Sequence, residues 1–345
     1  MSNKVTITQI ANQCKVSPAT VSLVLNDRPG VSEETRARVL ETAKLLGYKH
    51  SYSANGKLRR LTNVGIIVKT EPKLLPPSNP FYSQIIVGVD DACSDLGINL
   101  LFSMLPVDDN NHPAKIPPLI DKTMVNGLLM VGAFIDKTII SLFGYSLPPI
   151  VLVDGYSDTG SYDMVVSDNF GAAHQAVEHL LQLGHRHIGL IGGEVGCYPS
   201  ICERRNGYLR ALEKYGIKNS YIANFNINRS QGEEETIRLI NKYPQITAIF
   251  CVNDNVALGA IRAAQHLGRN VPKDLSIIGY DDTYLATSIS PSLTTMHVDT
   301  LAMGRAAVHL LALRLEKPDA ARATLVIHPT LIERESTAPL SKPAK

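Results

Sequence analysis

The sequence predicts an N-terminal all-α head with a helix-turn-helix, followed by an α/β core of two lobes built on parallel sheets. Two observations lead to this fold class. Within residues 5–48, short segments with helix-capping residues follow one another closely. From Val64 onward, short apolar runs alternate with helical stretches, as in parallel α/β sheets. Because roughly 280 residues exceed the usual size of one domain, we expect the core to divide into two lobes.

Capping residues mark the helices of the head. Thr6 and Gln9 have the spacing of a capping box, so the first helix is expected to begin after Thr6. Ser17 precedes Pro18, which is favoured at the first position of a helix, and this pair predicts the second helix. Ser32 predicts the start of the third. The buried face of the third helix is expected to contain Val39, Leu40, Ala43 and Leu46.

The first 60 residues are strongly basic. They hold ten Lys and Arg residues against four Asp and Glu residues, a net charge of +6. Because the whole chain has a net charge of +2, the remainder carries −4. A basic head on an acidic body is typical of proteins that bind nucleic acid. The alternative is a solvated basic arm, which the capped helices disfavour.

Four motifs cover most of the head. They are Val5-Thr6-Ile7, VSPATVSLVLN at residues 16–26, VSEETR at residues 31–36, and Leu46-Gly47-Tyr48. In these motifs the segment resembles the DNA-binding head of the LacI/GalR (lac repressor/purine repressor) family of transcription regulators. The resemblance implies a helix-turn-helix domain at residues 1–48 that reads duplex DNA.

The resemblance implies two kinds of DNA contact. Short polar side chains match family positions that touch the phosphate backbone, and such contacts fix the register of the protein on DNA. They are Thr6, Ser17, Thr20, Ser22, Asn26, Ser32 and Thr35. The alternative role for Ser17 and Ser32 is helix capping alone. Base reading is expected from the exposed positions of the second helix, Pro18, Ala19 and Leu23.

Leu23 stands where many better-known members of the family carry Arg or His. An apolar side chain contacts the methyl group of thymine, but it cannot form the paired hydrogen bonds that Arg forms with guanine. We therefore expect weaker direct reading of the major groove and a greater contribution from the minor groove and from DNA shape.

Residues 49–61 form the expected linker. The family folds this stretch into a hinge helix on DNA and inserts a Leu into the minor groove, which makes Leu58 the candidate here. The family spacing places that Leu one residue earlier, at Lys57, and Gly56 disfavours a helix by about 1 kcal/mol relative to Ala. The alternative is a flexible basic linker that becomes ordered only on DNA.

The core, residues 62–345, contains apolar runs that we expect to be strands, at residues 64–68, 100–105, 127–131, 150–153, 188–191, 248–252 and 275–278. Helical stretches separate them, at residues 82–96, 171–183, 203–215, 231–242 and 256–267.

The core resembles the periplasmic-binding-protein-like sensor of the same family. The landmarks are NPFY at residues 79–82, VSDN at residues 166–169, GHRHI at residues 184–188 and VPKDLSIIGYDD at residues 271–282. The resemblance implies that the chain crosses between lobes near residues 166, 295 and 325. One lobe is then expected at about 62–165 and 296–325, the other at about 166–295 and 326–340, with a ligand in the cleft.

Candidate effector contacts lie where strands end, because α/β sheets bind ligands there. Four of them match effector-binding positions of the family, and two are aromatic residues that can stack on a flat ligand. The six are Phe81, Tyr82, Asp154, Arg204, Asn253 and Asp281. This donor and acceptor set suits a polyol or sugar. The alternatives are a structural ion pair between Arg204 and Asp281, and core packing for Tyr82.

Nothing in the sequence argues for catalysis, a cofactor or a metal. It contains no phosphate-binding loop, no zinc-protease helix and no serine-hydrolase turn. His185 and His187 are expected to be structural. The five cysteines form no Cys-x-x-Cys pair, which indicates a reducing cytoplasm. The DNA-binding pattern begins at once, so no export signal is expected, and no apolar run reaches the roughly 18 residues of a membrane span.

The sequence therefore predicts a cytoplasmic, ligand-gated repressor, most simply of a carbohydrate-utilisation operon. No heptad repeat follows residue 330, so we expect a homodimer on a pseudo-palindromic operator. The alternative is an extracytoplasmic-type solute (sugar)-binding protein without catalytic activity, which has no use for residues 5–48. A sugar or nucleoside hydrolase needs paired carboxylates, and the adjacent Asp281 and Asp282 are expected to point apart.

Overall fold

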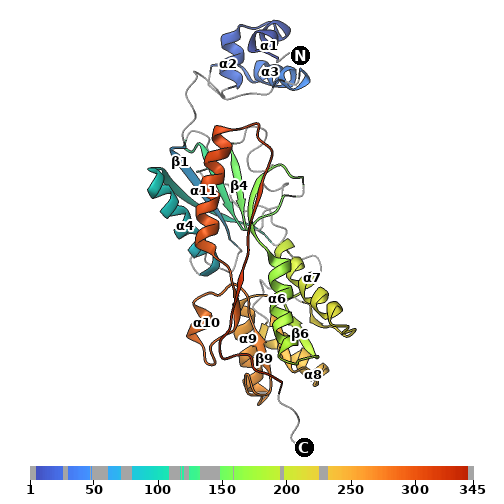
Figure 1. Cartoon of the computed structure of the whole chain (residues 1–345). Helices are drawn as coiled ribbons and strands as arrows, with labels where there is room; N and C mark the ends of the chain where they lie inside the picture. The colour runs from blue at the N-terminus through green and yellow to red at the C-terminus, as the bar shows by residue number, and fades with distance from the viewer. Residues whose placement is uncertain are drawn as a thin grey trace, which may run out of the picture. The chain divides into compact units, whose positions relative to one another are not determined.

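The computed structural model describes residues 5–25, 30–46, 48, 61–70, 80–108, 117, 119, 124–132, 148–157, 159–194, 198–224 and 232–340. The chain forms two compact units, Met1–Arg59 and Arg60–Lys345 (Figure 1). Asn26, Leu58 and the predicted hinge helix, apart from its last residue Leu61, lie outside the described residues.

The first unit contains three short helices, α1 (Ile7–Cys14), α2 (Pro18–Leu25) and α3 (Glu33–Leu45). The predicted capping box is confirmed, because the Thr6 side chain accepts from the Gln9 N–H and the Gln9 side chain accepts from the Thr6 N–H. The chain then turns sharply from α1 into α2, which is the geometry of a helix-turn-helix.

The core of the first unit consists of Ile10, Ala11, Cys14, Val21, Val24, Leu25, Val39 and Ala43. The expectation that Leu40 belongs to this face is wrong, since Leu40 is 49% exposed. Val39 and Ala43 are one helical turn apart and share a face, whereas Leu40 is rotated by about 100° from Val39.

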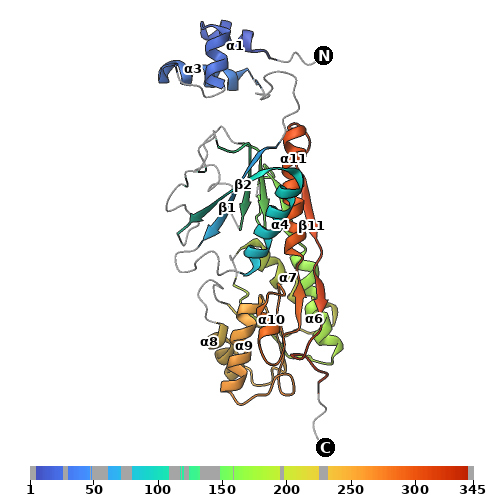
Figure 2. The ribbon, with the colours of Figure 1, turned by 90° about the vertical axis from the view of Figure 1, so that its left-hand side faces the viewer.

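The second unit contains a six-stranded parallel sheet in the order β11-β5-β4-β3-β1-β2. Its strands are β1 (Asn63–Thr70), β2 (Asn99–Pro106), β3 (Gly127–Val131), β4 (Ile150–Val153), β5 (Asp163–Ser167) and β11 (Thr324–Ile327). The helices α4 (Pro80–Leu96) and α11 (Thr300–Glu316) pack side by side against this sheet (Figure 2). We call this sheet with its helices the first lobe.

A four-stranded parallel sheet in the order β7-β6-β8-β9 forms the second lobe. Its strands are β6 (Ile188–Ile191), β7 (Tyr221–Ala223), β8 (Ala248–Cys251) and β9 (Ser276–Ile278). Around it lie α6 (Asn169–Gln182), which packs against α7 (Pro199–Lys214), and α8 (Gly232–Lys242), which packs against α9 (Asp254–His266). The short helix α10 (Leu285–Ser288) contacts α9.

The chain passes between the two lobes at three places (Figure 1). It leaves the first lobe where β5 runs into α6, returns between β10 (Thr295–His297) and α11, and leaves again between β11 and β12 (Thr330–Ile332). The strands β10 and β12 pair antiparallel and tie two of these crossings together. Because the lobes meet at strand ends, side chains that follow β4, β8 and β9 can converge on one site.

Candidate functional site

The exposed face of α2 carries the residues predicted to read bases. Pro18 and Ala19 are exposed at its start, and Leu23 is 37% exposed one turn later. Val21 and Val24, on the opposite face, are buried in the small core. The second helix therefore presents an apolar strip to the surface, as the sequence predicts.

Most of the described polar residues expected to contact phosphates lie at helix starts. Ser17 Oγ accepts from the Thr20 N–H at 3.0 Å and lies 2.8 Å from Thr20 Oγ1. Ser32 Oγ accepts from the Thr35 N–H at 3.4 Å. Ser17 and Ser32 remain exposed although they cap, and a helix N-terminus attracts phosphate, so capping and DNA contact are compatible roles here. Thr6 is likewise exposed, whereas Ser22 is half-buried.

Asp281 follows β9, and its carboxyl group faces Arg204. Its Oδ1 is buried and lies 3.3 Å from Arg204 Nη1, but this contact does not have the geometry of a hydrogen bond. Its backbone has φ 103°, which a residue other than Gly rarely adopts. Burial raises the pKa of Asp281 to about 8, although the Arg204 guanidinium acts in the opposite direction. A buried acceptor held in a strained backbone conformation is a typical feature of a binding site.

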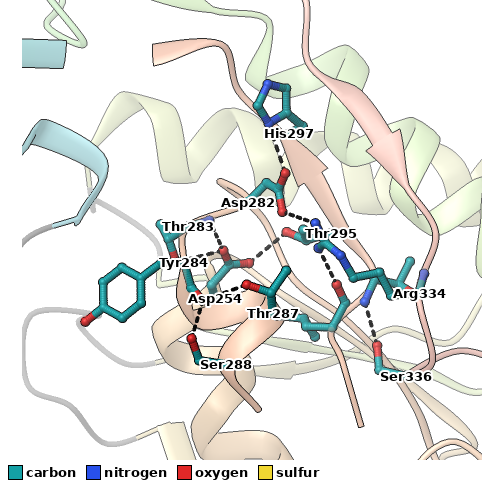
Figure 3. A network of polar contacts seen from close by, with 12 residues as sticks. Asp254, Asp282, Thr283, Tyr284, Thr287, Ser288, Thr295, His297, Arg334 and Ser336 are labelled. Atoms are coloured by element: carbon teal, nitrogen blue, oxygen red, sulfur yellow. Dashed lines mark hydrogen bonds and ion pairs between the residues drawn. The ribbon is translucent and has the colours of Figure 1, made fainter. Parts of the chain in front are cut away.

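Two neighbouring carboxylates are fully engaged by the protein (Figure 3). Asp254 accepts from Thr295 Oγ1 at 2.7 Å and from the backbone N–H of Thr283 at 2.6 Å. Asp282 contacts Arg334 at 2.7 Å and His297 at 3.0 Å, which fixes the turn that holds Asp281. Thus Asp281 and Asp282 point to different partners, as predicted, and only Asp281 among these three lacks hydrogen bonds to its buried oxygen.

Arg204 lies on α7 and is buried. Its Nε donates to Asn169 Oδ1 at 2.8 Å, and its Nη1 donates to the Val252 carbonyl at 2.6 Å. Nη1 also lies 3.3 Å from Asp281 Oδ1, and the guanidinium stacks 3.7 Å from the centroid of the Tyr280 ring. These contacts fix the guanidinium beside Asp281.

Gly207 allows α7 to approach α6 closely enough for this arrangement. A Cβ at Gly207 would lie 2.4 Å from the backbone oxygen of Phe170, on α6. Any larger residue would push α7 away from α6 and move Arg204, one turn earlier, from its partner Asn169.

Asp154 follows β4 and contributes the carboxylate of the first lobe. It is buried, has φ 51°, and accepts from the Tyr82 hydroxyl at 3.1 Å. Burial raises the pKa of Asp154 to about 6, and Arg204 and Tyr82 act in the opposite direction. Phe81 is buried in the main core, with its ring 5.5 Å from that of Tyr82 in an edge-to-face arrangement. Tyr82 therefore orients Asp154, and Phe81 supports Tyr82.

Asn253 and Asp168 both act as helix caps. Asn253 Oδ1 accepts from the Val256 N–H at 2.9 Å at the start of α9. Asp168 Oδ1 accepts from the Gly171 N–H at 2.8 Å at the start of α6. The cap leaves the amide nitrogen of Asn253 as its possible donor to a ligand.

The structure adds contacts between the lobes that the sequence does not reveal. The Lys69 ammonium, at the end of β1, donates to the Tyr198 hydroxyl and lies 3.9 Å from the ring centroid. The Tyr156 hydroxyl, after β4, donates to Glu203 on α7 at 2.9 Å. We call these two pairs the interlobe clasp. Nothing in the sequence pairs Glu203 with Tyr156, which lies 47 positions earlier in the chain.

The histidines that follow α6 have structural roles. His185 lies 2.9 Å from Thr247 Oγ1 and 3.1 Å from the Ala338 carbonyl, and His187 lies 2.9 Å from the Tyr221 hydroxyl. Within the described residues, no group of His, Cys, Asp and Glu side chains has the arrangement of a metal site. No helix among those residues is long and apolar enough to cross a membrane.

Comparison with known proteins agrees with this arrangement of head and core. A family model described as bacterial regulatory proteins, lacI family, matches residues 6–51, and one described as a periplasmic binding protein-like domain matches residues 177–337. The HTH-type transcriptional repressor PurR of Mannheimia succiniciproducens is 31% identical over 338 residues, 96% of this chain and 98% of that protein. The chain belongs to the LacI family.

Other LacI-family relatives match over nearly the whole chain. Catabolite control protein A of Priestia megaterium is 32% identical over 337 residues, 96% of this chain and 99% of that protein. A solved complex of the transcriptional regulator CelR with cellobiose superposes with a TM-score of 0.70 at 27% identity, covering 96% of this chain and 100% of that one. The lac repressor dimer bound to operator and the anti-inducer ONPF has a TM-score of 0.63 at 25% identity, with 97% and 100% covered.

Membership of the LacI family confirms the predicted family, fold class and non-enzymatic character. The chain is a transcriptional repressor with a helix-turn-helix DNA-binding head and a ligand-binding core. The prediction of a catalytically inactive regulator therefore holds, and the hydrolase alternative does not.

Proposed function

We propose that this repressor is gated by a polyhydroxylated ligand, most simply a sugar, that binds between Asp154 and Asp281. It acts in the cytoplasm as a homodimer on a pseudo-palindromic operator that controls carbohydrate utilisation. The observation that carries the ligand class is the buried Asp281 Oδ1, which has an ion pair with Arg204 but no well-directed hydrogen bond. A buried acceptor of this kind favours a ligand rich in hydroxyl donors.

The placement of the acceptors supports this proposal. Asp154 comes from the first lobe and Asp281 from the second, while Arg204 interacts electrostatically with both. A ligand that bonds both carboxylates gains more in an arrangement where the lobes are close. Such differential affinity is what a ligand needs to shift the equilibrium between two conformations of a regulator.

Relatives support two ligand classes. The CelR structure holds cellobiose, and other relatives are repressors named PurR, a name that indicates purines. A nucleobase is the second candidate ligand, because Tyr82 and other aromatic residues lie near Asp154 and Asp281. The rings of Tyr198 and Tyr280 already stack on the cations of Lys69 and Arg204, so a nucleobase would have to compete for these ring faces. We therefore favour a sugar over a nucleobase.

The test is a gel shift of the purified chain against genomic fragments, with a panel of sugars and a panel of nucleobases. We expect operator fragments with inverted half-sites, and a change in their affinity with a sugar. Sedimentation of the complex should show two chains per operator. The ligand proposal fails if nucleobases alone change the affinity.

Leu23→Arg is expected to change the base preferred in each half-site. Leu23 is the exposed apolar residue on α2, and Arg there can form a paired contact with guanine worth about 1–3 kcal/mol of discrimination. Binding-site selection with both proteins measures the change. A consensus identical to that of the wild type would show that α2 does not read bases at this position.

Lys69→Met is expected to weaken ligand binding without disturbing the head. The change removes the Lys69–Tyr198 half of the interlobe clasp, and a buried cation–π contact with its hydrogen bond is worth roughly 1–2 kcal/mol. Titration calorimetry with the ligand found in the panel should show about a tenfold lower affinity. Lys218→Met, at an exposed position, serves as the control and should match the wild type.

A further inference from the structure

The charges around the proposed ligand site are unbalanced. The charged groups that act on Asp154 include the cations Arg204 and Lys69 and the carboxylate of Glu203. Those that act on Asp281 are Arg204, Asp154 and Asp254. Carboxylates therefore outnumber cations among these described neighbours of the site.

Both cations are already engaged by the protein. Arg204 donates to the Val252 carbonyl and to Asn169, and its face lies on the Tyr280 ring. Lys69 donates to Tyr198 and lies over its ring. A bound phosphate would have to compete with these protein partners for the two cations.

Two of the helix starts beside the site, those of α6 and α9, are occupied by side-chain caps, whereas α7 has no side-chain cap and begins at Pro199, which has no N–H to donate. Backbone N–H groups at a helix N-terminus commonly bind phosphate. Here Asp168 accepts from the Gly171 N–H of α6, and Asn253 accepts from the Val256 N–H of α9. The Asp168 carboxylate also adds negative charge at the start of α6, where a phosphate would otherwise bind.

Resting on the proposed function, we infer that the site takes the unphosphorylated form of its polyol and rejects the phosphate ester. A phosphate monoester carries about −1.5 to −2 charges at neutral pH and requires several donors. Beside the carboxylates of Asp154 and Glu203 it meets like charges instead, and above pH 8 the ionised Asp281 adds a further one. The effector is therefore a compound released by hydrolysis or taken up unchanged, before any kinase acts on it.

The first test compares matched pairs by titration calorimetry on the full-length chain. The pairs are ribose with ribose 5-phosphate, glucose with glucose 6-phosphate, and cellobiose with its phosphate ester. In every pair that binds, we expect the free sugar to bind at least tenfold more tightly. A phosphate ester that binds as tightly as its free sugar overturns the inference.

The second test uses inorganic phosphate as the probe and does not depend on finding the effector. Asp281→Asn removes one negative charge, and Asn tolerates the positive φ of this position. At pH 8.5 we expect this variant to bind phosphate at least tenfold more tightly than the wild type, whereas Glu213→Gln, on an exposed side chain, matches the wild type. Equal phosphate affinity of wild type and Asp281→Asn overturns the inference. If no polyol in the panel binds, the proposed function is contradicted. The comparison of phosphate affinities still tests whether the site rejects phosphate.

Discussion

Replacing Asp281 with Asn is expected to abolish the response to ligand. At pH 8.5, above the raised pKa of Asp281, the substitution keeps the shape of the side chain but removes a charged acceptor, and a hydrogen bond to a charged group is worth about 1.5–3 kcal/mol. We therefore expect ligand affinity to fall by roughly ten- to a hundredfold. Gel shifts with increasing ligand measure the response. Operator binding without ligand should persist, because the head forms a separate compact unit.

The stability of the same variant distinguishes a ligand contact from a structural ion pair with Arg204. Burial raises the pKa of Asp281 to about 8, above the ordinary value of 3.8. A carboxyl group with a raised pKa makes the folded chain less stable as pH rises from its ordinary value towards the raised one. The Asn variant should thus have a melting temperature at pH 8.5 equal to or above that of the wild type.

A lower melting temperature of Asp281→Asn at this pH would indicate that the ion pair with Arg204 is structural. Asp274→Asn is a suitable control, because Asp274 lies at an exposed turn of the second lobe. The pKa of Asp274 is lowered by hydrogen bonds from Asn270, so its replacement should slightly reduce stability instead. The two Asp→Asn changes are therefore expected to shift the melting temperature in opposite directions.

Replacing Arg314 with Met is expected to have the largest effect on stability. Arg314, on α11, forms a two-point contact with Asp163 at 2.6 and 2.8 Å, and Asp163 is fully buried at the start of β5. Removing one partner of a buried pair leaves an uncompensated charge, which costs about 3–5 kcal/mol. Denaturant unfolding of the core should show this loss. Because the pair joins α11 to β5, it also holds two segments that lead into lobe crossings.

Arg322 provides a matched control for Arg314. Its Nη1 lies 3.7 Å from Asp163 Oδ2, but its side chain is 43% exposed. Arg322→Met should therefore cost less than about 1 kcal/mol. Burial raises the pKa of Asp163, but hydrogen bonds from Arg314 and the Ala323 N–H outweigh burial and hold the pKa below its ordinary value. This contribution is lost as pH falls below about 4, and the Arg314 variant should lose that dependence.

The sequence predicts those helix caps and buried strands that depend on residues close together in the chain. The capping box at Thr6 and Gln9 is present, and the apolar runs at residues 127–131, 150–153 and 188–191 coincide with β3, β4 and β6. Capping and continuous burial depend on neighbours close in the chain, so periodicity and residue type are sufficient. The helix α11 was not singled out, because burial against both α4 and the sheet removes the one-sided apolar pattern of a surface helix.

The candidate ligand residues were also identified from the sequence, through the family resemblance, but their roles were not. Asp281, Asp254 and Asp282 are all carboxylates near strand ends, and only the folded chain shows that the buried oxygen of Asp281 has an ion pair but no well-directed hydrogen bond. The interlobe clasp joins Lys69 to Tyr198, residues more than a hundred positions apart. Side chains from separate strands and helices meet only after both lobes form. The sequence alone therefore determined the two-part architecture and the surface of α2, whereas tertiary packing decided which buried polar groups form hydrogen bonds within the protein and which do not.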